Sequence, residues 1–188
     1  MNGEKPKQAY KVIGTRPIRH DGADKVTGRA IYGSDLQLAG MLHGKIVRSP
    51  HAHARIKHID TSAAEKLPGV YAVMTAADLP DLRDRVADLG EGRVNLAHLG
   101  ANVLAHQKAL YKGHAVAAVA AVNPHVAEEA AKLINVEYEP LPAVTWVLDA
   151  MQADAPLLHD NVYTEDMTGH RTSEKPSNAS KYLLFEEG

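Results

Sequence analysis

The sequence predicts an α/β (α+β) fold made of two β-α-β units on a mixed sheet, followed by an extended C-terminal tail. A helix-start signature at 62–65 lies between β-prone residues at 56–59 and 70–75. A second signature, Asn123-Pro124, begins a helical pattern between β-prone residues at 115–122 and 135–139. The stretch 169–180 is polar and without period, which predicts an extended and mobile segment.

Composition narrows the classes of function. The chain has 188 residues, of which 45% are apolar and 23% charged, so a packed core is expected. Its net charge of -2 and its lack of a basic run argue against nucleic-acid binding. The absence of Cys excludes disulfides, thiolate ligands and an iron–sulfur cluster held by this chain. The polar N-terminus and the absence of a long apolar run predict a cytoplasmic protein without a membrane anchor.

The N-terminal part predicts a flexible lead-in at 1–13 and then two strands. At 26–36 (VTGRAIYGSDL), Gly28 and Gly33 flank a short β-prone stretch, as in a strand entered and left through turns. A second strand is expected at 41–48, ended by Ser49-Pro50. Further on, the spacing of Leu82, Val86 and Leu89 suggests a helical turn or two, and 90–100 suggests a loop.

In the first unit, Ser62 and Glu65 form the S-x-x-E capping box, in which each side chain satisfies a free backbone N–H of the first helical turn. The helix must be short, because Pro68 disfavours α geometry before it and Gly69 supplies a turn. The alternation at 70–75 predicts a strand.

In the second unit, the run 115–122 (AVAAVAAV) is ambiguous, since its valines recur every three residues as in a helix. Its shortness favours a buried strand whose alanines let a helix approach closely. Asn123 is a good N-cap with Pro124 at the first helical position. One apolar stripe follows, made of Val126, Ala130, Leu133 and Ile134. Burying its larger side chains should contribute roughly 5–9 kcal/mol to folding, before entropy is subtracted. The variant Leu133→Asp is therefore expected to unfold the domain. The alternation of apolar and acidic residues at 135–139 predicts a strand with one solvent-exposed face.

Three ordered segments carry a family resemblance: VTGRAIYGSDL at 26–36, IVRSPHAHARIKHIDTSAAEKLPGVYAV at 46–73 and GHAVAAVAAVNPHVAEEAAKLINVEYEPLPAV at 113–144. They resemble the N-terminal α/β-hammerhead domain of the molybdopterin-binding large subunit of the xanthine dehydrogenase, aldehyde oxidase and carbon monoxide dehydrogenase family. The 4-hydroxybenzoyl-CoA reductase α subunit is similar. The resemblance implies a hammerhead domain at 14–151 and, at 152–188, a linker with the truncated start of the pterin-binding domain.

That resemblance also implies a function. The complete large subunit of the family inserts a water-derived oxygen into an aldehyde, purine or other heterocycle, or oxidises CO, using molybdenum on a pterin dinucleotide. Companion subunits or domains carry 2Fe–2S clusters and FAD. The family's pterin-binding loops and catalytic glutamate lie beyond residue 188. We therefore expect no catalytic, cofactor-binding or metal residues here, and a scaffold and assembly role in a molybdenum-dependent oxidoreductase whose N-terminal segment alone is inactive.

Several residues are candidates for a metal, catalytic or anion-binding site. His51 and His53, two apart on an expected strand, could share a metal, but no third ligand follows at suitable spacing. The acids at 21, 24 and 35 are more typical of turns and caps than of a catalytic pair. Lys112-Gly113-His114 could form a small anion-binding turn, without a Gly-rich loop to support it. Glu128, Glu129, Glu137 and Glu139 are expected on the solvent-exposed faces of a helix and a strand. Asn178-Ala179-Ser180 fits the glycosylation pattern, which has no meaning in a cytoplasmic protein.

Two other functions remain open at this point. The chain could be a free-standing module of the same fold that binds a small ligand or a protein. It could also be an independent metallohydrolase built on His51 and His53. The sequence does not identify a substrate.

Overall fold

The computed structural model describes residues 10–82, 85–88, 90 and 93–185. The chain divides into two compact units, with the boundary between Met41 and Leu42. The predicted domain limits of 14–151 and 152–188 stay predictions.

In the first unit, the predicted strand at 26–36 is wrong. Helix α1 (Gly22–Thr27) occupies its start, and a single 3-10 turn, η1 (Gly33–Asp35), follows. Gly28 adopts the left-handed conformation at φ 73° and closes α1, donating its N–H to the carbonyl oxygens of Asp24 and Lys25. The described residues of this unit, 10–41, contain no strand with which the β-prone stretch could pair, and local capping sets the conformation instead.

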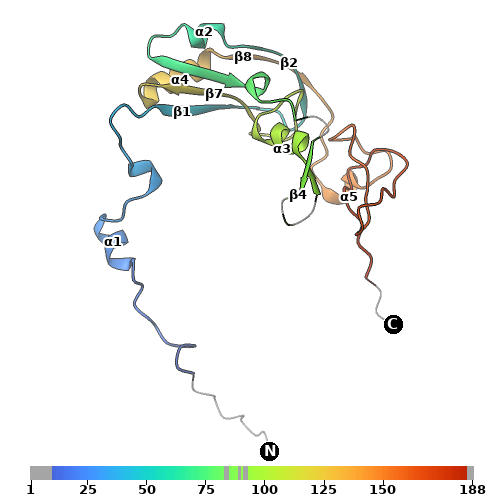
Figure 1. The fold of residues 1–188 in the computed structure, drawn as a ribbon, viewed down its shortest axis with the longest axis horizontal. Helices are drawn as coiled ribbons and strands as arrows, with labels where there is room; N and C mark the ends of the chain where they lie inside the picture. The colour runs from blue at the N-terminus through green and yellow to red at the C-terminus, as the bar shows by residue number, and fades with distance from the viewer. Residues whose placement is uncertain (1–9, 83–84, 89, 91–92, 186–188) are drawn as a thin grey trace, which may run out of the picture. The chain divides into compact units, whose positions relative to one another are not determined.

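The described residues of the second unit form two three-stranded sheets and a two-stranded one. Figure 1 labels several of their strands. In the first sheet, β7 (Ala115–Ala121) lies between β1 (His43–Arg48) and β3 (Val70–Thr75). In the second, β2 (Ala54–Asp60) lies between β6 (Lys108–Ala109) and β8 (Asn135–Pro140). Every described strand pair is antiparallel. The strands predicted at 41–48, 70–75, 115–122 and 135–139 are thereby confirmed.

The α/β class with a hammerhead arrangement is confirmed, but the strands of each β-α-β unit lie in different sheets. The chain passes from β2 through α2 (Ser62–Glu65) to β3, and from β7 through α4 (Pro124–Leu133) to β8. Each helix thus connects the β6-β2-β8 sheet to the β1-β7-β3 sheet. The predicted mixed sheet is replaced by two antiparallel ones, a pairing that local sequence signals do not encode.

The core lies where α2 and α4 pack against the β1-β7-β3 sheet. Ala117 and Ala130 are fully buried, so the alanines do allow the close helix–sheet approach that the sequence predicted. The predicted stripe needs one correction, since Leu133 is 40% exposed whereas Ile134 is buried. The helix begins as predicted, with the Asn123 side chain accepting from the Val126 N–H and Pro124 at its start.

Helix α2 begins differently from the prediction. Its N-cap is Thr61, whose hydroxyl donates to the Glu65 carboxylate, so the expected Ser62–Glu65 box does not form. The Ser62 N–H is instead satisfied by the Asp60 carboxylate at 3.0 Å. Gly69, at φ 92°, then turns the chain into β3.

The predictions for 82–100 are wrong where the structure describes these residues. Strand β4 (Val86–Asp88) replaces the helical turn and pairs with β5 (Arg93–Asn95), and α3 (Leu96–Val103) replaces part of the loop. Leu89 lies outside the described residues. The missed signal was Asn95, which caps α3 by accepting the Ala97 N–H at 2.9 Å.

After β8 the chain forms α5 (Val147–Ala150) and then a segment with only isolated bridges of Glu165 to Arg171 and Lys181. Residues 169–180 form no helix and no strand apart from the bridge at Arg171, and their mobility stays a prediction. Among the described helices, none has the length and apolarity to cross a membrane.

Candidate functional site

The Ser49–His53 motif is a structural turn between β1 and β2. Ser49 is 2% exposed, and its hydroxyl accepts the His51 N–H at 3.1 Å. The rings of His51 and His53 have different partners, and the His51 ring meets Tyr138 edge-on at 5.0 Å between centroids. His53 is buried and its Nδ1 bonds the Pro142 carbonyl oxygen at 2.8 Å. That carbonyl can only accept, so Nδ1 carries the proton and Nε2 is left as an acceptor.

The His53 Nε2 has no hydrogen-bond partner, and neither has the buried Nε2 of His98 on α3. The His98 ring lies 5.6 Å from that of His159, between centroids. Burial lowers the pKa of His159, and the nearby His98, Lys108 and His53 lower it further. Lys108 is ion-paired with Asp160 at 3.0 Å. Sequence reasoning missed this cluster, because its members come from four separate segments.

His114 lies in the interior of the domain and does not form an anion-binding turn. Its ring is fully buried, with Nδ1 accepting the Leu110 N–H at 3.1 Å and Nε2 bonded to the Ala101 carbonyl oxygen at 2.9 Å. It also stacks on Tyr111 at 4.4 Å. Burial lowers the His114 pKa, which favours a neutral imidazole. A neutral ring with both nitrogens engaged cannot hold an anion.

The acids at 21, 24 and 35 occupy the turn and cap positions that the sequence suggested. Asp21 is the N-cap residue of α1, and hydrogen bonds from Arg19 and then Lys25 lower its carboxyl pKa. Asp24 pairs with Arg29, and Asp35 accepts the Tyr32 N–H at 2.9 Å. On the second unit, Glu128 and Glu139 are half exposed and lie beside lysines. Hydrogen bonds from Lys132 to Glu128 and from Lys57 to Glu139 lower the pKa of each carboxyl.

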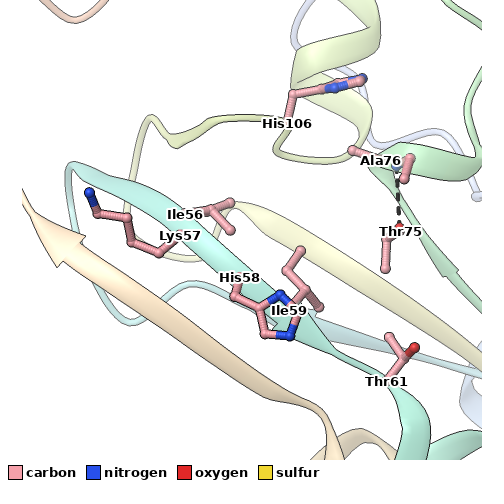
Figure 2. Close-up of a pocket in the computed structure, with 9 residues that line it drawn as sticks. Ile56, Lys57, His58, Ile59, Thr61, Thr75, Ala76 and His106 are labelled. Carbon is pink, nitrogen blue, oxygen red and sulfur yellow. Dashed lines mark hydrogen bonds between the residues drawn. The ribbon is translucent and has the colours of Figure 1, made fainter.

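An open hollow of about 370 Å³ lies between β2 and the end of β3 (Figure 2). Its polar lining includes His58, His106 and Thr75. The Thr75 hydroxyl is already engaged as acceptor of the Ala77 N–H at 3.3 Å. Lys57, also in the lining, is paired with Glu139 at 2.6 Å. Two of the polar groups in the lining, Thr75 and Lys57, are thus engaged within the domain.

That the described residues hold no molybdenum cofactor stays a prediction. No three His, Asp or Glu side chains among them converge as metal ligands. The two buried side-chain atoms without a partner in this part of the chain are imidazole nitrogens, not donors arranged around a diphosphate.

These features define a class: an α/β domain in which the helices α2 and α4 link two antiparallel sheets. Most of the polar side chains considered above make hydrogen bonds or ion pairs within the domain. Residues 27–142 match the family model described as "Aldehyde oxidase and xanthine dehydrogenase, a/b hammerhead domain". The chain belongs to this family.

Its relatives are large enzyme subunits. The chain is 45% identical over 151 residues to the carbon monoxide dehydrogenase large chain of Afipia carboxidovorans, covering 80% of this chain and 18% of that one. It is 43% identical to the 6-hydroxypseudooxynicotine dehydrogenase complex subunit gamma of Paenarthrobacter nicotinovorans, over 70% of this chain and 17% of that one. A solved Cu,Mo-CO dehydrogenase in its carbon monoxide reduced state superposes with a TM-score of 0.67 at 41% identity, covering 87% of this chain and 20% of that one.

The chain thus spans less than a fifth of the length of the curated relatives it matches. The family includes molybdenum-containing enzymes, and its members include a large chain and a subunit of a dehydrogenase complex.

Proposed function

We propose that this chain is the N-terminal, non-catalytic domain of a molybdenum hydroxylase large subunit and serves as scaffold and in subunit assembly. The observation that carries the proposal is the hammerhead match over 27–142 in a chain that spans under a fifth of its relatives. The arrangement of the polar residues supports it, because the buried histidines and the serine turn are used in hydrogen bonds that hold segments of the domain together.

The complete protein is then a cytoplasmic molybdenum-dependent oxidoreductase. It performs oxidative hydroxylation of an aldehyde, purine or other heterocycle, or oxidises CO. Molybdenum on a pterin dinucleotide supplies the oxidation chemistry from the remainder of the large subunit. Iron–sulfur and FAD subunits are the partners that carry the electrons away.

Similarity over this domain does not identify the substrate. Relatives of almost equal identity, 45% and 43%, are named for substrates as different as carbon monoxide and 6-hydroxypseudooxynicotine. The substrate of the complete enzyme therefore cannot be assigned from these two relatives.

A first test is the coding sequence past codon 188. The proposal expects an open reading frame of several hundred further codons that encodes the pterin-binding part of the subunit. A stop codon at that point, with saturable small-ligand binding by the 188-residue chain, would replace the proposal by a free-standing binding module.

A second test is a domain exchange in the complete enzyme. Residues 1–188 are replaced by the matching part of the Afipia carboxidovorans large chain, and assembly and substrate preference are measured. Assembly with an unchanged substrate preference is expected. A preference that follows the exchanged domain would contradict the scaffold role.

A further inference from the structure

Residues 159–160 are attached to the earlier part of the domain by two contacts of different kinds. The Asp160 carboxylate pairs with the Lys108 ammonium of β6 at 3.0 Å. The His159 ring lies beside the ring of His98 on α3, at 5.6 Å between centroids and tilted by 42°. The first contact joins opposite charges. The second joins two imidazoles, so it is favourable only while the two rings do not both carry a proton's charge.

The surroundings of the His159 ring disfavour a positive charge on it. Burial is the largest cause that lowers its pKa, and three groups from other segments lower it further: His98, Lys108 and His53. Asp160 opposes them, but its carboxylate is already paired with Lys108 and is largely exposed to solvent. The Lys108 side chain, in contrast, is only 12% exposed, so water screens its charge poorly.

Two ring nitrogens of this cluster point the same way. Among the described residues, the buried Nε2 atoms of His53 and His98 have no hydrogen-bond partner. Because His53 bonds the Pro142 carbonyl oxygen through Nδ1, its Nε2 is the unprotonated nitrogen. A proton added there would create a buried charged N–H for which the described residues supply no acceptor. The cluster is therefore suited to neutral rings.

We propose that His98 and His159 form a pH-sensitive latch, which holds the segment around residues 159–160 against α3 at neutral pH and releases it in acid. Neutral rings can pack together, whereas imidazolium ions beside Lys108 repel one another. In the released segment the His159 ring is in water and binds a proton at about pH 6.5, so acidification below that pH favours release. The latch goes beyond the proposed function and does not depend on it, because all of its groups lie in this chain.

The test follows the contact between Lys108 and Asp160 in the isotope-labelled 188-residue chain by NMR, through the nuclear Overhauser effect between the two side chains. We expect the ratio of released to attached chains to rise about five- to twentyfold from pH 7 to pH 5, because release takes up one proton. This range stays above about pH 3.9, where ordinary aspartates titrate. The amide signals of β7 and α4 should not move, which separates release of the segment from unfolding.

Two variants separate the latch from a general effect of acid. His159→Gln keeps a polar side chain that takes up no proton, and its ratio of released to attached chains should not depend on pH. His170→Gln is the matched control, because it removes an exposed histidine from the same part of the chain. Its response to pH should equal that of the wild type. The readout is the dependence on pH and not the ratio at one pH, since glutamine can weaken the contact equally at every pH.

Three results would overturn the latch. One is an equal dependence on pH in the wild type and in His159→Gln. Another is a wild-type contact that persists unchanged to pH 5, or one that is lost only when the whole chain unfolds. The third is a contact that ignores pH but is strengthened by added zinc ions in the wild type and not in His159→Gln, which would mark the cluster as a metal site instead.

Discussion

The imidazole of His114 is fully buried and uses both nitrogens in hydrogen bonds to backbone groups of other segments. We predict that His114→Leu lowers the free energy of unfolding by about 2–4 kcal/mol, because it leaves a buried N–H and a buried carbonyl without partners. Urea denaturation measures the change. The exposed His125 is the matched control, and His125→Leu should alter stability by less than about 0.5 kcal/mol.

The same residues predict how stability depends on pH. Burial lowers the pKa of His114 and His159 below the ordinary value of 6.5, whereas the unfolded chain takes up protons near that value. Below pH 6.5 the unfolded state therefore binds more protons, and stability should fall as the solution is acidified. Urea midpoints between pH 7.5 and 5.5 check this. A chain that becomes more stable over that interval would contradict neutral, buried histidines.

At the scale of single residues, the sequence predicted local roles and missed those that need tertiary contacts. The Asn123 cap and the turn role of Asp35 are set by neighbours in the sequence, so the pattern of residue types was sufficient. The particular partners of His114 were not predicted, because the Ala101 carbonyl comes from α3, a helix that the sequence reading treated as loop. The His98–His159 contact was missed for the same reason.

Helix α4 shows how an element can be predicted while its buried face is not. The start and the extent of α4 follow from Asn123-Pro124 and the apolar period, but the helix buries Ala127 and Ala130 and leaves Leu133 partly in solvent. The alanines of β7 allow α4 to approach closely, so small side chains fill the interface. The face that a helix buries depends on its partner sheet, which the helix sequence alone does not specify.

This geometry predicts opposite sensitivities on α4. Ala130→Leu should destabilise the chain by about 1–3 kcal/mol, because the larger side chain has no space against β7. Leu133→Ala should cost less than about 1 kcal/mol. Chemical denaturation of both variants measures the two changes in the free energy of unfolding. A larger loss of stability at Leu133 than at Ala130 would contradict the packing described here.

The turn after α2 is equally specific. A Cβ at Gly69 would lie 2.8 Å from a methyl of Val122, in a backbone at φ +92°. Gly69→Ala should therefore cost about 1–3 kcal/mol for the backbone strain and more for the clash. Gly113→Ala is the control, with a similar φ of +91° and open space at its Cβ. Equal losses in thermal stability would show that the contact with Val122 has no effect.

For the whole molecule, the elements of both β-α-β units and the α/β class could be predicted, but the division into two sheets could not. Each local signal marks where a strand or helix begins, whereas the pairing of β7 with β1 and β3 joins segments far apart in the chain. The expectation that this chain holds no set of catalytic residues rests on the lack of a complete catalytic motif in its sequence. It remains part of the proposal.

The central claim is that these residues supply shape, while the atoms that move electrons are held by other polypeptide. The direct measurement is the molybdenum and pterin content of the 188-residue chain, purified from a host that makes the molybdenum cofactor and analysed by metal mass spectrometry and pterin fluorescence. The account predicts amounts far below one per chain. One molybdenum and one pterin per chain would contradict it.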